Sequence, residues 1–458
     1  MQPFMGLLRP IFCWYLVNMA LISTIYADAI PPLPDDETYF AYTLSLPDPV
    51  ADEVKEAPQR LPQVIRNEAP PLNLATLEAI TLTDHPTVLT AVAEMQAARG
   101  TWLQSGLRPN PTIGYAGTEI GNERRAGFQG AYWQQTFVRG NKLQLNRAVA
   151  SQEVAWREQA VISAELDVLT ELRVAFYQLL VIQERHRVLS SLVEISHQAE
   201  QTALQLVEAQ EKPRTDHLQA SIELARFRTD LQSTVIAKRK ARRALEARAG
   251  QQQTDWQEVD GSVQPMPEPL EWQQTIDEIL STHPSIIMAT SAVQRARYQL
   301  ARERAEPIPN LQTQIMVQHD DSTDLVVPSV QAVWAIPWHN RNQGAIARAQ
   351  ADLRAAVQQL NERRLDLRRE AADLFADYET AAQRVTAFET SILPQASETQ
   401  QLITEAYRGQ EIEFLVLLTA QRTFFQSTLA YLNALESLWT SRWRVLGMMP
   451  MQAIPRPQ

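Results

Sequence analysis

The sequence is poor in cysteine and glycine. Cys13 is the only cysteine among 458 residues, and it lies close to the amino terminus. Disulfide bonds within the chain and a thiolate metal site in the rest of it are therefore excluded. The 14 glycines are roughly 3% of the chain, against about 7% in average proteins. With abundant Ala, Leu, Gln, Glu and Arg, this scarcity favours long helices.

The sequence also lacks the patterns of the common catalytic and nucleic-acid-binding sites. A formal net charge of −11 argues against a nucleic-acid partner. There is no phosphate-binding glycine loop, no HExxH motif and no grouped nucleophile and base, so we predict neither an enzyme nor a cofactor. No histidine pair has i,i+4 spacing, and we predict no metal site; the seven histidines are His85, His186, His197, His217, His283, His319 and His339.

The amino terminus has the features of a secretory signal. Arg9 precedes an apolar stretch at 11–22, and Ala27-Asp28-Ala29 offers a small-residue cleavage site, so we predict a signal peptide over 1–29. The alternative, an uncleaved anchor, is disfavoured because a membrane-spanning helix needs about 20 apolar residues. After this segment no stretch of 18 apolar residues occurs. The exported chain could therefore be soluble, or it could cross a membrane as strands.

The chain contains nearly the same pattern twice, about 200 residues apart. His85-Pro86 and His283-Pro284 each mark a helix start, and each helix ends at a proline cluster about two dozen residues later. This repeat predicts a duplicated helix–strand–strand–helix unit in a mainly α protein with a small β part. The predicted segments are an acidic, proline-rich arm (30–73), a first repeat (74–250), a linker (251–270), a second repeat (271–448) and a carboxy-terminal tail (449–458).

Helices of unusual length dominate each repeat. In the first we expect helices from 74 to the His85-Pro86 break, at about 87–107, from 142 to about 212, and at 216–249. The third of these would span on the order of 100 Å. In the second we expect helices at about 285–305, 343–408 and 412–446, with a bend at Pro394. Small residues and alternating charges along 343–390 predict coiled-coil packing.

Four short segments alternate in polarity as strands do, and we place them at 112–120, 128–137, 310–318 and 325–336. Each is nine to twelve residues long, near the roughly 9–11 needed for a tilted transmembrane strand. A small amphipathic sheet in a soluble protein is the alternative. Because the smallest membrane barrels have about eight strands, four would have to be shared among several chains. The candidates for an aromatic girdle at the membrane are Tyr115, Trp133, Phe137, Trp334 and Trp338.

Several segments resemble the TolC-like outer membrane efflux proteins, and within them the CzcC-like branch that serves cation-exporting pumps. The resemblance covers about 74–448 and rests on motifs in both repeats. These are HP…LRPNPTI at 85–113, EIGN at 119–122, IPWHNRNQGAIARAQADL at 336–353, YRGQ at 407–410 and LLTAQRTFFQSTLAYLNAL at 417–435.

The resemblance implies a homotrimer in the cell outer membrane. Four strands from each of three chains would form a 12-stranded barrel in the lipid, and the helices would form an α-barrel through the periplasm. The implied partners are a periplasmic adaptor and an inner-membrane pump of the resistance-nodulation-division type. The implied activity is passive efflux, for heavy-metal cations or, alternatively, for drugs and small organic compounds. A soluble periplasmic coiled-coil or adaptor protein is the rival class.

The resemblance also suggests roles for the two long-helix turns, which would contact the adaptor. The candidate contacts are Tyr407, Arg408, Gly409, Gln410, Glu211, Lys212 and Pro213. The first turn lacks a glycine matching Gly409, which distinguishes the two contacts. Asp216 and Glu413 lie just past the turns and could form acidic gates in the pore. Alternatively, they are solvated carboxylates favoured by the positive end of the helix dipole.

Overall fold

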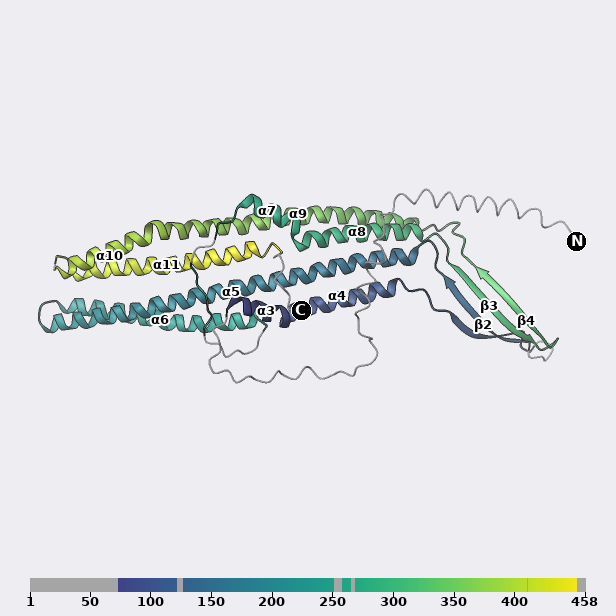
Figure 1. Ribbon diagram of the computed structural model, residues 1–458, viewed down its shortest axis with the longest axis horizontal. Helices are drawn as coiled ribbons and strands as arrows, with labels where there is room; N and C mark the ends of the chain where they lie inside the picture. Colours follow the sequence, from purple (N-terminus) through teal and green to yellow (C-terminus); the bar gives the residue numbers. More distant parts are fainter. Residues whose placement is uncertain (1–72, 122–126, 251–257, 265–267, 410, 451–458) are drawn as a thin grey trace. The chain divides into compact units, whose positions relative to one another are not determined.

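The structure is a computed structural model that describes residues 73–121, 127–250, 258–264, 268–409 and 411–450 (Figure 1). The predicted signal, most of the arm and residues 451–458 lie outside this range, as do parts of the linker.

The described elements occur in the same order in both repeats. The first repeat contains α3 (Leu74–Asp84), α4 (Pro86–Ser105), β1 (Thr112–Thr118), β2 (Phe128–Phe137), α5 (Lys142–Glu208) and α6 (Arg214–Arg248). The second contains α7 (Trp272–Thr282), α8 (Pro284–Ala305), β3 (Leu311–Asp320), β4 (Leu325–Val333), α9 (Gln343–Ala387), a π-helical turn (Phe388–Ile392), α10 (Leu393–Arg408) and α11 (Phe414–Leu446). Sequence reasoning placed no helix at α7, although the position of α3 in the first repeat implies one.

The His-Pro pairs break the helices as predicted. Pro86 and Pro284 are the first residues of α4 and α8, where a missing amide hydrogen costs nothing. In each pair the histidine ring caps the new helix: the amide of Thr87 lies 3.3 Å from His85 Nδ1, and the amide of Ser285 lies 3.1 Å from His283 Nδ1. The repeated motif is therefore a capped helix junction, used once in each repeat.

Two strands of each repeat join in one antiparallel sheet with the order β1-β2-β3-β4. The central pair joins the repeats, with Trp133 opposite Ile315. Three predicted bounds change. The first strand ends at Thr118 because Glu119 turns into the left-handed region (φ 56). The third strand runs two residues further, to Asp320. The fourth ends at Val333, which pairs with Gln312, one residue from the start of β3.

The contacts divide the chain into two compact units, and each draws on both repeats. The first contains the sheet with residues 106–148 and 297–349. Its strand-to-helix corners use left-handed backbone at the same place in each repeat, at Asn141 (φ 57) and Asn342 (φ 62), one residue before α5 and α9. Asparagine tolerates this conformation better than most residues. Asn342 Nδ2 also donates to the Glu303 carbonyl at 3.0 Å, which fixes the second corner.

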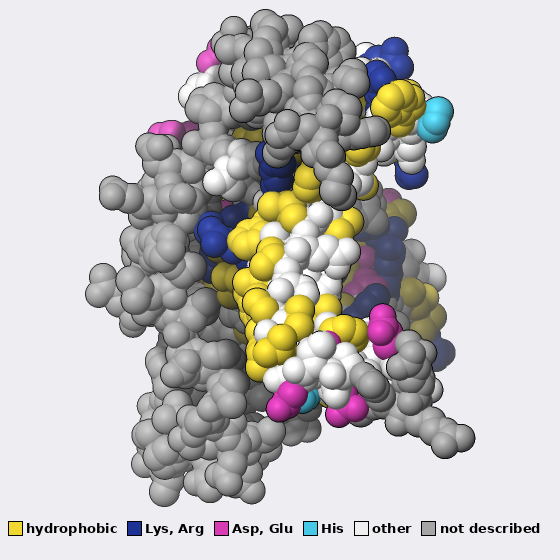
Figure 2. All heavy atoms as spheres, turned by 90° about the vertical axis from the view of Figure 1, so that its right-hand side faces the viewer, with side chains coloured by type: hydrophobic (Ala, Val, Ile, Leu, Met, Phe, Trp, Pro, Cys, Tyr) yellow, Lys and Arg dark blue, Asp and Glu magenta, His cyan; other side chains and the backbone are white. Residues whose placement is uncertain are grey.

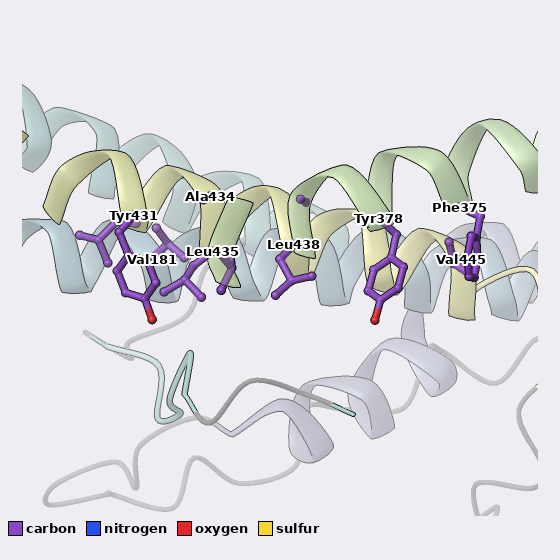
Figure 3. Packing of buried hydrophobic residues seen from close by; sticks show 11 residues of the cluster. Val181, Phe375, Tyr378, Tyr431, Ala434, Leu435, Leu438 and Val445 are labelled. Carbon is purple, nitrogen blue, oxygen red and sulfur yellow. The ribbon is translucent and has the colours of Figure 1, made fainter. Parts of the chain in front are cut away.

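The second unit is helical and holds the buried hydrophobic clusters. One cluster joins α3, α5 and the end of α6 around Leu77, Leu172 and Leu245. A second joins α5, α9 and α11, and Figure 3 shows its side chains, including Val181, Tyr378 and Leu438, packed along the helices. The nearby aromatic side chains Tyr177 and Trp439 stack with centroids 4.1 Å apart. The second cluster therefore joins helices from both repeats.

The predicted bend at Pro394 is a π-helical turn. Proline has no amide hydrogen and its ring clashes with the carbonyl four residues earlier, so the regular pattern fails just before it. Residues 388–392 absorb the irregularity, and the Leu393 amide instead donates to the Phe388 carbonyl. Tyr431 in α11 donates to Glu389 Oε1 at 2.7 Å and accepts from Gln264 Nε2 at 2.8 Å. These bonds tie the turn to the neighbouring helix.

Candidate functional site: the sheet and the helical turns

One face of the sheet is apolar across all four strands. Directly opposed residues of an antiparallel sheet share a face. The register therefore places Ile113, Trp133, Ile315 and Val330 in one row, and Tyr115, Ala131, Val317 and Pro328 in the next. Ile113 and Val330 are each 78% exposed. Figure 2 shows hydrophobic side chains in a vertical band, with Asp, Glu and His side chains at its lower end. The described chain leaves this face uncovered.

The opposite face of the sheet carries most of the polar side chains, beside apolar ones such as Met316 and Val327. Thr112, Gln134, Gln314 and Gln331 occupy one row of it. Further along β3, Gln318 and Asp320 also lie on this face and are buried. The alternation predicted for the third strand is present, with its glutamines on this face and Ile315 and Val317 on the more apolar one. This division is the one expected where a sheet separates lipid from water.

Three of the five aromatic candidates, Tyr115, Trp133 and Phe137, lie on the apolar face of the sheet at different depths. Tyr115 lies three residues before Thr118, the last residue of β1, and Trp133 lies in the middle of β2. Phe137 ends β2 opposite Leu311, and Trp334 and Trp338 follow the end of β4. All five are exposed, from 37% for Trp133 to 74% for Trp338.

The two long-helix turns have the same backbone form. In the first, the Glu211 amide donates to the Leu206 carbonyl at 2.9 Å, and Gln210 has a φ of 62. In the second, the Glu411 amide donates to the Ala406 carbonyl at 3.0 Å. This five-residue reach is the helix-ending pattern in which one left-handed residue reverses the chain. Its equivalent position in the second turn is Gln410, which lies outside the described residues.

Gly409 is therefore not the residue that the turn needs for its conformation. It has right-handed backbone (φ −76), and the nearest atom to an added Cβ would be the Ala406 carbonyl oxygen at 3.5 Å. The glycine that the first turn lacks does not change how that turn is built. The two turns differ at this position only in the residue they present, which is Ala209 in the first and Gly409 in the second.

Side chains of the two turns meet. Lys212 Nζ lies 6.0 Å from the ring centroid of Tyr407, at the outer limit of a cation–π contact. The Tyr407 ring in turn lies 5.8 Å from the ring of Phe414, which is buried between α5, α6 and α11. Burial and the charge of Asp216 raise the pKa of the Tyr407 hydroxyl. Lys212 and Tyr407 are thus brought together, while Glu211, Pro213 and Gly409 remain exposed; nothing is described of the Arg408 side chain.

The two candidate gate acids occupy different positions. Asp216 is in the first turn of α6, is partly buried and lies near Tyr407. Glu413 is the exposed residue that begins α11, and its side chain makes no capping hydrogen bond. The equivalent of Glu413 in the first turn is Pro213, which likewise begins its helix. The acids are therefore not a repeated pair.

Sequence reasoning missed an ion pair that joins the repeats above the turns. Two guanidinium nitrogens of Arg422 in α11 donate to the Glu223 carboxylate in α6. Nη2 lies 2.7 Å from Oε2, and Nε lies 3.3 Å from Oε1. The Glu223 side chain is only 9% exposed, and its charge raises the pKa of Arg422. The two residues are 199 positions apart, so no local pattern in the sequence could have paired them.

The described residues contain no group of three His, Cys, Asp or Glu side chains that could hold a metal ion. In the acidic turn after β3, His319 Nε2 lies 3.4 Å from Asp324 Oδ1. Asp320 accepts hydrogen bonds from Ser322 and Thr323 of the same turn. The polar side chains of this turn therefore contact one another.

No helix in the described part of the chain has both the length and the apolar composition required to span a bilayer.

Comparison with known proteins confirms the predicted resemblance. Residues 275–448 match the family described as outer membrane efflux protein. The cobalt-zinc-cadmium resistance protein CzcC of Cupriavidus metallidurans is 22% identical over 394 residues, which cover 84% of this chain and 93% of CzcC. The chain is therefore similar to outer membrane efflux proteins over residues 275–448 and to CzcC along most of its length.

Solved structures confirm the fold. A CusC structure aligns with a TM-score of 0.67 at 15% identity, covering 87% of this chain and 99% of CusC. The outer membrane protein VceC of Vibrio cholerae aligns with a TM-score of 0.66 at 16% identity, covering 82% of this chain and 95% of VceC. The mainly helical fold with one small antiparallel sheet is that of these proteins.

Proposed function

We propose that the protein is the outer-membrane channel of a tripartite efflux system, in which three copies form a passive export duct. The observation that carries this proposal is the sheet with one uncovered, mainly apolar face and most of its polar side chains on the other. Burying such a face in lipid removes apolar surface from water at roughly 25 cal/mol per Å². In water the same face would be an aggregation hazard. A soluble coiled-coil or adaptor protein gains nothing from it.

The sheet also supports sharing of strands between copies. Its order leaves β1 and β4 as edges, with no further strand beside either in the described residues. Unpaired backbone groups are not tolerated in hydrocarbon, so each edge would have to pair with another copy. Three copies of four strands give the 12-stranded barrel expected of the family.

The helical turns are the proposed contact with the periplasmic adaptor, which would link the channel to an inner-membrane pump of the resistance-nodulation-division type. The exposed residues Glu211, Pro213 and Gly409 would form the contact surface, together with Arg408 and Gln410. The Lys212–Tyr407 contact would hold the two turns in register. Asp216 and Glu413 would place negative charge where the duct narrows.

We propose heavy-metal cations as the cargo, because CzcC is by name a cobalt-zinc-cadmium resistance protein and it aligns along most of this chain. Export of drugs or small organic compounds is the alternative. The lack of a metal-binding group in the described residues fits both, since a passive duct leaves selection to the pump.

Growth of a deletion strain tests the function and the cargo together. The strain should lose resistance to cobalt, zinc or cadmium, and the wild-type gene should restore it. Loss of resistance to organic toxicants alone would reassign the cargo. Unchanged growth on both classes, with the cognate pump present, would contradict the proposed role in efflux.

A further inference from the structure

The carboxy-terminal part of α6 carries a dense positive surface in an acidic chain. Residues 238–243 read KRKARR, five cations in six positions, while the whole chain has a formal net charge of −11. Lys238 pairs with Glu258 at 2.6 Å and Arg242 with Glu246 at 3.1 Å. Arg239, Lys240 and Arg243 are exposed and form no ion pair with another described residue. These three residues are called the α6 basic face below.

Repulsion between like charges makes the α6 basic face electrostatically unfavourable. Arg239 and Arg243 are four residues apart on the helix, and Lys240 and Arg243 are three apart, so their charges are neighbours and repel. The exposed side chain of Ile236, 63% accessible, adjoins them one turn earlier. A negatively charged segment laid along this face would relieve the repulsion.

The chain preceding α3 starts close to this face. Leu77 of α3 and Leu245 of α6 belong to the same buried cluster, and the partly buried Leu74 and Ala241 pack against that cluster. At the other end of α3, a Cβ built on Gly250 would lie 3.2 Å from His85 Cα. The two helices therefore run side by side in the same direction, as Figure 1 also shows. Asn73, which caps α3, thus lies near the level of residues 240–243.

The segment that ends at Asn73 has the opposite charge. Residues 30–72 contain eight carboxylates and three cations, and residues 48–56 contain four carboxylates and one lysine. The 16 residues between this stretch and Asn73 can reach at most about 53–58 Å. That is enough to pass around α6, whose diameter with side chains is about 10–12 Å. A tether of this length gives an effective concentration near the millimolar range.

We propose that the acidic stretch 48–56 binds the α6 basic face of the same chain. Asp48, Asp52, Glu53 and Glu56 would pair with Arg239, Lys240 and Arg243. This contact would fasten the amino-terminal arm to the helical unit at a defined place. It does not depend on the proposed transport function.

Crosslinking in the full chain tests the position of the arm. In a Cys13→Ser background, Ala51→Cys and the exposed position Ala247→Cys should form an intramolecular product with a short bismaleimide. The same arm cysteine paired with Ala355→Cys, an exposed position of α9, should not. Absence of the first product, or a product found only between two chains, would overturn the proposal.

Charge variants test the chemistry. Combining Arg239→Gln, Lys240→Gln and Arg243→Gln should lower the crosslinking rate about fivefold, the effect of losing three weak, solvent-screened ion pairs. The matched control combines Arg354→Gln, Arg364→Gln and Arg368→Gln on the exposed surface of α9 and should leave the rate unchanged. Neutralising the four arm carboxylates should reproduce the α6 result without touching a described residue, which guards against misfolding of the α6 variant. Equal rates in all three variants would reject the contact.

Discussion

At the scale of single residues, His283 shows how one side chain can make a helix junction sensitive to pH. Arg363 Nε donates to Ser285 Oγ at 2.9 Å, and Ser285 Oγ lies 2.8 Å from His283 Nδ1. Burial, and then the charge of Arg363, lower the pKa of His283 from 6.5 to about 4. The ring is therefore held neutral as an acceptor.

We predict the following pH dependence. Because the pKa of His283 is lower in the folded state, its contribution to stability is fully present above pH 6.5 and is lost as the pH falls toward 4. His283→Asn keeps an acceptor for the Ser285 amide but cannot titrate. Denaturant unfolding from pH 7 to 4 should show a smaller loss of stability in this variant. His85→Asn at the matching junction is the control, and identical pH profiles for wild type and His283→Asn would refute the assignment.

Gly447 and Gly409 allow a paired prediction about the room for a side chain at each position. A Cβ at Gly447 would lie 2.1 Å from Thr170 Oγ1 and 2.9 Å from Thr170 Cβ, whereas a Cβ at Gly409 meets only ordinary contacts. Gly447→Ala should lower the free energy of unfolding by about 1–3 kcal/mol through overpacking. Gly409→Ala should leave it within about 1 kcal/mol of wild type. Adding Thr170→Ala should recover part of the Gly447→Ala loss; equal stability of the two single variants would count against the packing.

At the scale of elements, substitutions on the two faces of the sheet give the sharpest prediction. Ile315 and Gln314 are adjacent in β3, and the register places them on the apolar and polar faces. A lysine on the lipid face of a membrane strand costs about 2–4 kcal/mol near the middle of the bilayer. Ile315→Lys should therefore reduce the amount of folded protein recovered in the outer membrane, while Gln314→Lys should not. Equal recovery of the two variants would mean that the apolar face does not contact lipid.

Much at this scale follows from the sequence, and the exceptions have physical reasons. The His-Pro junctions, the four strands and the bend at Pro394 are local signals, so they could be predicted. Helix α7 was missed although Trp272–Thr282 occupies the place of α3 in the repeat. Strand ends depend on pairing, as at Val333, and pairing is not local. The Glu223–Arg422 ion pair depends on the fold alone.

At the scale of the whole molecule, the duplication explains why each compact unit draws on both repeats. The central strand pair β2 and β3 joins the repeats in the sheet, and the cluster of α5, α9 and α11 joins them among the helices. Neither repeat holds the complete sheet, and the cluster of α5, α9 and α11 forms only when both are present. Deleting one repeat should therefore leave an unfolded product, not half a channel.

The turn contacts could be predicted only in part at this scale. The sequence placed Lys212 and Tyr407 at two separate turns, and the structure brings them within 6.0 Å. It also shows that the backbone of the second turn does not require a glycine at position 409. A glycine that the turn does not need is free to serve recognition.

The central claim is that one chain supplies too few strands for a pore and that three copies complete it. The direct measurement is the mass of the protein component in detergent by light scattering, followed by conductance of the same sample in a planar bilayer. We expect the mass of three chains and stable ion conductance. A single-chain mass with no conductance would contradict it.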